Sequence, residues 1–321
     1  MKIAILDDYA NVALQMADWQ SLGGEVTVFQ DTLPESPALL ERLQPFDVIC
    51  AMRERTPFPA SVLGALPNLK LLVTTGPRNL SIDLEAAAAS RVTVCGTESR
   101  KTSTSELSMT MLLALSRRLL PEVSAMHSSG WQTGLGRDLA GQTLGLIGLG
   151  KIGAQMAALG KAFGMEVCAW STNLTAERCA ELNVAQCDTL ENLMASADAM
   201  SVHLVLSDRS RGLVGASAFE AMKPGSIFIN TSRGPIVDND ALIASLHRNT
   251  RCMAGIDVFD EEPLPFDHPM RDQKLIDEGR LLLTPHLGYV TEQTWRVFYT
   301  QTVDAIAAWQ TGKPIRLLTP A

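Results

Sequence analysis

Residues 143–153 read TLGLIGLGKIG, an apolar run that ends in glycines at positions 148, 150 and 153. The spacing is G-x-G-x-x-G after a predicted strand, and apolar residues follow at helical spacing. In such a turn the first glycine permits the bend, the second lets the backbone approach a pyrophosphate, and the third lets the helix pack on the strand. The stretch therefore predicts a dinucleotide site, with these cofactor contacts: Gly148, Gly150, Lys151, Ile152 and Gly153.

The whole chain has 321 residues, which suggests two domains. Its net charge of −8 argues against nucleic acid as a main partner, so an anionic substrate would need local arginines. No apolar run reaches membrane-spanning length, and the N-terminus does not read as a signal peptide, so the expected location is the cytoplasm. The six scattered cysteines contain no C-x-x-C and predict reduced thiols, and no metal site is expected.

Short apolar strands alternate with helical segments in both halves of the chain. This rhythm is typical of βαβ units on parallel sheets. In the first half, strands are predicted at 3–6, 26–29, 48–51, 69–74 and 92–95. In the second half, they are predicted at 144–147, 166–170, 199–204, 226–230, 252–256 and 281–283. The fold class is therefore α/β, and the first half lacks a glycine fingerprint.

Three longer segments lie outside this alternation. Residues 102–126 carry one apolar stripe and predict a single long helix that crosses between domains and is a candidate for subunit contact. Residues 260–279, rich in proline and charge, predict an irregular insert. Residues 291–311 predict a final helix that packs on the first domain.

Four polar side chains follow predicted strands of the second half. Ligands of open parallel sheets gather beyond the carboxyl ends of the strands. Arg233 is suited to bind a carboxylate through two hydrogen bonds, His286 to transfer a proton, and Glu262 to orient the imidazole. Asp257 stands at a strand tip, where a nicotinamide carboxamide is expected. The alternatives are a surface arginine, a solvated acidic run and a hydrogen-bonded loop histidine. As a set, these groups favour hydride transfer between a dinucleotide and a 2-oxo acid.

Four motifs together resemble the D-isomer-specific 2-hydroxyacid dehydrogenase family. They are GLIGLGKIG at 145–153, MKPGSIFINTSRGPIVDNDAL at 222–242, GIDVFDEEP at 255–263 and TPHLGYVT at 284–291. The resemblance spans essentially the whole chain. It implies that Arg233, Glu262 and His286 are catalytic and that Asp257 lies against the nicotinamide. Ser171 and Thr231 are further predicted cofactor contacts.

The same resemblance implies two doubly wound parallel-sheet domains. A Rossmann-type dinucleotide-binding domain at 102–289 is expected to be inserted into a flavodoxin-like substrate-binding domain formed by 1–101 and 290–321. It also implies a homodimer, in which the helix after Thr102 is similar to the one that such dimers use.

The first half adds substrate candidates. TTGPRNLSID at 74–83 stands where the family has a glycine-rich substrate loop, so Gly76, Arg78 and Asn79 are predicted to bind substrate, although Pro77 to Asn79 depart from the family pattern. AMRERTPF at 51–58 resembles the R-x-R-T segment of some 3-phosphoglycerate dehydrogenases. Arg53 and Arg55 would suit a substrate phosphate. Two solvated loop arginines are an equal alternative.

The choice between NAD and NADP is open. An NAD site usually has an acid at the tip of the second strand, about 20 residues past the glycines. Here the tip reads Ser171-Thr172-Asn173, and Arg178 is the nearest arginine. We therefore expect NADP(H) to be at least tolerated.

The leading hypothesis is an oxidoreductase for hydroxypyruvate, glyoxylate or 3-phosphoglycerate, with His286 as proton donor and acceptor. The alternative class is a dinucleotide-sensing, corepressor-like binding protein of the same fold, which need not keep the Arg–Glu–His set. A formate or phosphite dehydrogenase is disfavoured, because formate enzymes of this fold pair the histidine with glutamine and position 262 is glutamate.

Overall fold

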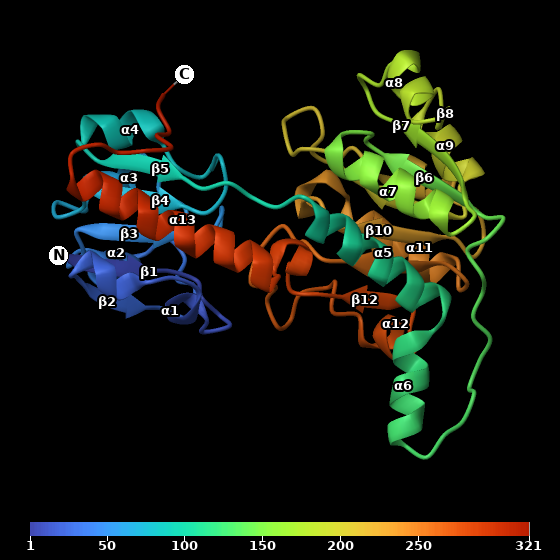
Figure 1. Cartoon of the computed structure of the whole chain (residues 1–321). Helices are drawn as coiled ribbons and strands as arrows, with labels where there is room; N and C mark the ends of the chain where they lie inside the picture. The colour runs from blue at the N-terminus through green and yellow to red at the C-terminus, as the bar shows by residue number, and fades with distance from the viewer. Residues whose placement is uncertain (321) are drawn as a thin grey trace. The chain divides into compact units, whose positions relative to one another are not determined.

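Figure 1 shows the computed structural model, which describes residues 1–320. The chain forms two compact units. Unit 1 combines Met1–Arg100 with the segment from Val290 onward, and unit 2 is Lys101–Tyr289. Unit 2 is thus an insertion into unit 1, and the first boundary falls between Arg100 and Lys101.

Unit 1 is a five-stranded parallel sheet in the order β2-β1-β3-β4-β5. This is the flavodoxin-like order of doubly wound sheets. Its strands are nearly the predicted ones: β1 (Lys2–Ile5), β2 (Glu25–Val28), β3 (Val48–Ala51), β4 (Leu71–Thr74) and β5 (Thr93–Gly96). The helical segments are α1 (Ala13–Met16), η1 (Trp19–Leu22), α2 (Pro37–Leu43), α3 (Ala60–Gly64), α4 (Leu84–Ala89) and α13 (Glu292–Gln310).

The final helix α13 belongs to unit 1, as predicted. It contacts β4, β5 and α1, and Tyr299 packs edge-on against Trp19 with ring centroids 5.9 Å apart (Figure 1). Thr291 caps its N-terminus by accepting the Thr294 N–H. The last segment of the chain therefore completes the core that the first segment begins.

Unit 2 is a seven-stranded parallel sheet in the order β12-β11-β10-β9-β6-β7-β8. The strand order reverses between β6 and β9, which is where a doubly wound sheet opens a ligand crevice. The strands are β6 (Thr143–Ile147), β7 (Glu166–Trp170), β8 (Ala185–Gln186), β9 (Ala199–Val202), β10 (Ile227–Asn230), β11 (Met253–Ile256) and β12 (Leu281–Leu283). Sequence reasoning missed only β8, a two-residue edge strand.

The helices of unit 2 cover both faces of this sheet (Figure 1). They are α5 (Thr102–Ser116), α6 (Leu119–His127), α7 (Lys151–Ala162), α8 (Ala176–Glu181), α9 (Leu190–Ser196), α10 (Ala216–Glu220), α11 (Asn239–Arg248) and α12 (Gln273–Asp277). Two buried clusters form the core, one around Phe228 and one around Leu146. All six cysteines are free thiols.

The single long helix predicted for 102–126 was wrong. The structure has two helices, α5 and α6, separated at Arg118, whose φ of 53° is left-handed. Pro121 explains the break, since a proline in a helix interior clashes with the carbonyl four residues earlier but is tolerated in a first turn. The restart at Leu119 puts Pro121 in the first turn of α6.

The insert at 260–279 is also not wholly irregular, because α12 lies within it. Asp272 caps α12 by accepting the Leu275 N–H. Within residues 1–320, none of the helices has the length and apolarity required of a membrane span.

Candidate active site

The glycine turn between β6 and α7 has the geometry that a dinucleotide cradle needs. Gly148 has a φ of 106°, and a Cβ there would lie 2.8 Å from the His203 carbonyl oxygen. A Cβ on Gly153 would lie 2.1 Å from the Gly148 carbonyl oxygen, so only glycine lets α7 sit this close to the turn. At Gly150 a Cβ would meet nothing within 4 Å, which leaves open space above the backbone. The backbone geometry of the three glycines is therefore compatible with the three roles that their spacing predicts.

Two further features fit a dinucleotide here. In the described part of the chain, no side chain caps the N-terminus of α7, whose N-cap is Gly150, so its first N–H groups stay available to a phosphate. His203 directly follows β9, and its Nε2 is buried without a hydrogen-bond partner among residues 1–320. Burial lowers the pKa of His203 to about 3, so its imidazole is neutral at neutral pH. A neutral ring with one unused nitrogen is suited to a polar ligand atom.

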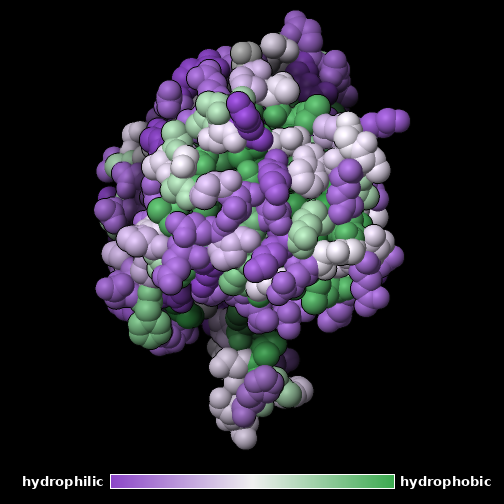
Figure 2. Space-filling model, turned by 90° about the vertical axis from the view of Figure 1, so that its left-hand side faces the viewer, coloured by the Kyte–Doolittle hydropathy of each residue, from purple (hydrophilic) through white to green (hydrophobic). Residues whose placement is uncertain are grey.

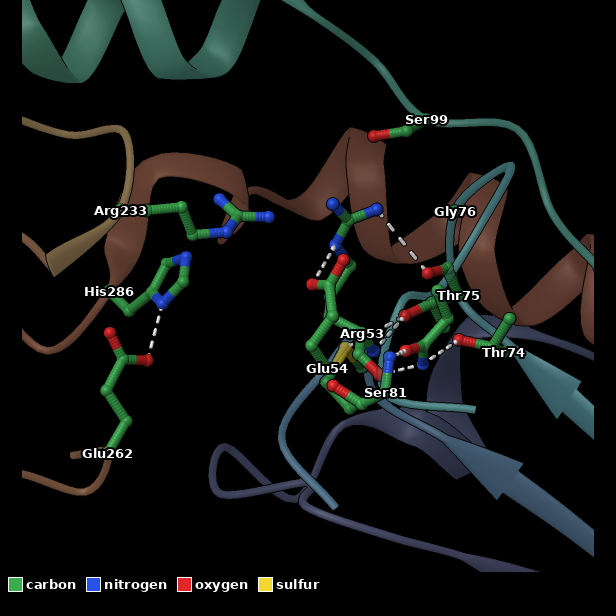
Figure 3. Close-up of polar contacts among 12 residues, drawn as sticks. Arg53, Glu54, Thr74, Thr75, Gly76, Ser81, Ser99, Arg233, Glu262 and His286 are labelled. Atoms are coloured by element: carbon green, nitrogen blue, oxygen red, sulfur yellow. Dashed lines mark hydrogen bonds and ion pairs between the residues drawn. The ribbon is translucent and has the colours of Figure 1, made fainter. Parts of the chain in front are cut away.

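His286 and Glu262 form a close pair. The Nδ1 atom of His286 lies 2.5 Å from the Oε2 atom of Glu262, and each side chain is less than one-fifth exposed. The other carboxylate oxygen, Oε1, accepts the Phe259 N–H at 2.9 Å. An ionised carboxylate can only accept, so Nδ1 carries the proton and Nε2 is left for a substrate. Figure 3 shows the imidazole between the Glu262 carboxylate and the Arg233 side chain.

Asp257 is fully buried, and its carboxylate binds the loop that carries His286. One oxygen accepts the Thr284 hydroxyl at 2.6 Å and the Leu287 N–H at 2.7 Å, and the other accepts the Gly288 N–H at 2.9 Å. Burial raises the pKa of Asp257 and these hydrogen bonds oppose the shift. The expected contact with the nicotinamide stays a prediction, whereas the contacts present in the structure organise the His286 loop.

Arg233 lies between β10 and the short helix η2 (Gly234–Ile236). Its Nη1 donates to the Ser232 carbonyl at 2.7 Å, and its own carbonyl accepts from the Asn230 amide at 3.1 Å. A Cβ on Gly234 would lie 2.2 Å from the Phe259 carbonyl carbon, so this glycine brings the Arg233 segment against the segment that leads to Glu262. Close backbone packing therefore places the arginine near the His–Glu pair.

Helix α5 contributes hydroxyl groups that sequence reasoning missed. The Ser108 hydroxyl lies 2.7 Å from that of Thr231, a predicted cofactor residue, and Thr104 donates to the Gly288 carbonyl at 2.9 Å. Thr284, beside Asp257, was missed as well. The only available signal was a run of small polar residues at 102–108, which reads equally well as an exposed helix face.

Unit 1 brings three of the predicted substrate residues close together: Arg53, Gly76 and Asn79. The Arg53 backbone N–H donates to the Thr75 hydroxyl at 2.9 Å, and both residues are labelled in Figure 3. The Asn79 side-chain amide donates to the Arg53 carbonyl and, at 2.9 Å, to the Thr74 hydroxyl. Gly76 has a φ of 99°, and a Cβ there would lie 2.0 Å from the Arg53 guanidinium. This glycine thus makes room for the arginine.

The other two substrate candidates differ from Arg53. The Arg55 guanidinium lies over the Tyr9 ring, 5.5 Å from its centroid, and Arg78 is exposed on its loop. Thr75, which sequence reasoning did not select, accepts the Arg53 backbone N–H and so holds the Arg53 backbone together with Asn79.

The tip of β7 carries Ser171, with no acidic side chain in the three residues after the strand. Arg178, on α8, turns back toward the glycine turn: its Nε donates to the Leu149 carbonyl at 3.3 Å, and its Nη1 pairs with Glu181 at 3.0 Å. A guanidinium therefore borders the turn on the side where β7 ends.

Comparison with known proteins identifies the family. The profile of the D-isomer specific 2-hydroxyacid dehydrogenase NAD binding domain matches residues 109–288. The chain belongs to this family. A glyoxylate reductase from Aeropyrum pernix is 34% identical over 265 residues, which cover 78% of this chain and 76% of that protein. A D-3-phosphoglycerate dehydrogenase from Mycobacterium tuberculosis is 32% identical over 85% of this chain, which spans about half (51%) of that relative.

Solved structures agree with this assignment. A phosphoglycerate oxidoreductase from Vibrio cholerae O395 superposes with a TM-score of 0.91 at 36% identity, covering 97% of this chain and 99% of that one. The apo D-lactate dehydrogenase from Escherichia coli has a TM-score of 0.83 at 25% identity, with 99% and 100% covered. The protein is thus a D-2-hydroxyacid dehydrogenase that acts on a CH–OH donor with a nicotinamide dinucleotide, and the predicted fold class and enzyme class are confirmed. Within residues 1–320, no three His, Cys, Asp or Glu side chains gather as metal ligands.

Proposed function

We propose that this dehydrogenase interconverts a small 2-oxo acid and its D-2-hydroxy acid, in the glyoxylate, hydroxypyruvate or 3-phosphoglycerate class. The observation that carries the proposal is the His286–Glu262 pair, 2.5 Å apart, beside Arg233 at the carboxyl edge of the unit 2 sheet. Relatives named glyoxylate reductase and D-3-phosphoglycerate dehydrogenase support the substrate class.

The bound dinucleotide supplies or accepts the hydride at C2 of the substrate. His286 gives a proton from Nε2 to the carbonyl oxygen during reduction and takes it back during oxidation. Glu262 holds the ring through Nδ1 and stabilises the imidazolium form, and Arg233 binds the substrate carboxylate and polarises the carbonyl. In unit 1, the predicted substrate-binding domain, the Arg53–Thr56 loop is proposed to bind a negatively charged group of the substrate.

For the cofactor, we propose that NADP(H) is accepted alongside NAD(H). No carboxylate follows β7 to repel a 2′-phosphate, and Arg178 stands beside the glycine turn where such a phosphate could be bound. Ser171, Thr231, Lys151 and Ile152 are proposed as further cofactor contacts.

A dinucleotide sensor of the same fold is the competing function. Such a protein needs the glycine cradle but has no use for a proton donor held by a carboxylate. The geometry of the His286–Glu262 pair therefore favours the enzyme.

The test combines a substrate panel with one matched pair of variants. Wild-type protein is assayed with glyoxylate, hydroxypyruvate and 3-phosphoglycerate using both cofactors, by absorbance of the reduced nicotinamide. His286→Ala should lower kcat by about 10² to 10⁴ while dinucleotide affinity stays near normal. The control is His247→Ala, because His247 also pairs with a carboxylate, Asp272 at 2.6 Å, but on the surface. A His286→Ala variant that kept more than about a tenth of kcat would refute the proton-donor assignment.

We further propose a homodimer located in the cytoplasm. Helix α6 has no buried residue and carries Leu119, Leu120, Val123 and Met126, all strongly exposed, and the loop after it exposes Trp131 (76%) and Leu135 (96%). In Figure 2 this segment projects at the bottom of the view, with hydrophobic surface at its upper end and paler or hydrophilic surface toward its tip. Glu122 accepts hydrogen bonds from Thr133 and Gly134, which tie the loop to α6; we call α6 and this loop, residues 119–135, the α6 arm. A second copy of the chain is the proposed cover for this apolar surface.

A further inference from the structure

Asp7 is a buried acid that the mechanism above does not use. It lies two residues after the end of β1, has a left-handed φ of 60°, and is 2% exposed. Its Oδ2 accepts the Thr56 hydroxyl at 2.9 Å, and its Oδ1 accepts the Thr32 hydroxyl. Because β3 is the neighbour of β1 in the sheet, the loop that follows β3 lies beside the β1 tip.

The loop in question, Arg53–Thr56, is held at both ends. At its beginning, Arg53 is tied through its backbone to the Thr75 hydroxyl and the Asn79 amide, both from the loop after β4. At its end, Thr56 is tied to Asp7. Arg53 is thus itself an attached residue, and Arg55 lies in the stretch between the two attachments.

The same cluster also reaches Arg55. Its guanidinium lies over the Tyr9 ring, and the Tyr9 hydroxyl is hydrogen-bonded to Thr32, which in turn binds Asp7. Burial raises the pKa of the Asp7 carboxyl, while the two hydroxyl groups and the positive charge of Arg55 lower it. Asp7 is therefore connected to the arginine loop both by a hydrogen bond and by charge.

Burying a carboxylate costs desolvation free energy, so the segments that it binds in return indicate which part of the structure it stabilises. The adjacent Asp8 shows the contrast: it is 1% exposed and accepts the Ala13 N–H at the start of α1, and within residues 1–320 it has no hydrogen bond to the Arg53–Thr56 loop. Asp8 shapes the β1–α1 turn, whereas Asp7 reaches across the sheet edge to the loop after β3.

We propose that Asp7 is a positioning residue, which acts through Thr56 to hold the Arg53–Thr56 loop in the conformation that binds the substrate. The inference rests on the proposed role of this loop in substrate recognition. In this role Asp7 takes no part in the reaction and contacts neither substrate nor cofactor.

The experiment compares paired variants in steady-state kinetics and dinucleotide titration. Asp7→Asn keeps the size but removes the charge, and Thr56→Val keeps the shape but removes the hydroxyl. Each should raise KM for the 2-oxo acid about tenfold, with kcat within about threefold and dinucleotide affinity unchanged. Thr56→Ser keeps the hydroxyl and should restore the wild-type KM. Asp8→Asn, the matched buried acid, should lower thermal stability without changing KM.

Arg53→Ala and Arg55→Ala separate the two proposals. If neither arginine variant raises KM, the loop does not bind substrate and the proposed function of this loop fails. If they raise KM while Asp7→Asn and Thr56→Val do not, only the positioning role is overturned. Should Asp7→Asn fail to fold, the KM of Thr56→Val is compared with that of Thr56→Ser. This comparison tests the positioning role, because both variants retain Asp7. Equal losses with Val and Ser would also overturn the role.

Discussion

At the scale of single residues, His286 shows how a reactive side chain is held. Its φ of 54° is left-handed, a conformation that costs a non-glycine residue about 1–2 kcal/mol. The N–H groups of the next two residues, Leu287 and Gly288, bind the Asp257 carboxylate, and Glu262 binds the ring. The backbone and the imidazole are thus positioned by two different acids.

His203 leads to a prediction about stability and pH. Burial depresses its folded-state pKa to about 3, below the ordinary value of 6.5. The unfolded chain therefore binds a proton that the folded chain does not, and the stability contributed by the neutral ring is lost as pH falls below about 6.5 toward 3. The expected cost is about 1.4 kcal/mol per pH unit in that window.

The variant His203→Gln removes this proton uptake. Between pH 7 and pH 5, its free energy of unfolding should fall less than that of the wild type, as measured by urea denaturation at a series of pH values. His127→Gln, an exposed histidine in the last turn of α6, is the control and should follow the wild type. Superimposable pH curves for His203→Gln and wild type would contradict the assignment.

At the scale of elements, we expect the β7–α8 connection to govern the choice between NAD(H) and NADP(H). Helix α8 begins at the Thr175 cap, and its first turns carry Arg178 toward the glycine turn. Arg178→Glu should lower kcat/KM for NADPH by about tenfold or more and leave that for NADH within about threefold, because only NADPH brings a 2′-phosphate.

Arg248→Glu is the matched control for that comparison. Arg248 is an exposed helical arginine of the same unit, paired with Glu220 at 3.8 Å and lying in the last turn of α11. It should change neither cofactor's kcat/KM. If Arg178→Glu lowered kcat/KM equally with NADH and NADPH, Arg178 would not bind the 2′-phosphate. A wild-type preference for NADH above about a thousandfold would contradict the proposed acceptance of NADP(H).

At the scale of the whole molecule, the α6 arm predicts the assembly. Val123→Glu with Met126→Glu places two charges on the apolar arm and should convert a dimer to a monomer in light scattering after size-exclusion chromatography. Leu14→Glu, an equally exposed apolar residue on α1, should leave the assembly unchanged. A wild-type protein that is monomeric at micromolar concentration would contradict the dimer.

Much of the fold was predictable because its signals are local. Short apolar runs predicted eleven of the twelve strand positions within a few residues. Ser36 followed by Pro37 is a local helix-start signal of the same kind, and in the structure Ser36 accepts the Leu39 N–H at the start of α2. The break at Arg118 was not predicted, because the apolar stripe continues across it and only the proline three residues later interrupts the helix.

The sequence alone determined the dinucleotide turn and the residues at the strand tips. Each is encoded by contiguous residues, and parallel strands bring their carboxyl ends to one edge whatever the details. Only the tertiary structure decided which residues hold those tips in place. Asp257 binds the backbone of Leu287 and Gly288, some thirty residues away, and Asp7 binds Thr56 across 49 positions. Such contacts depend on strand order and side-chain direction, which no local pattern in the sequence records.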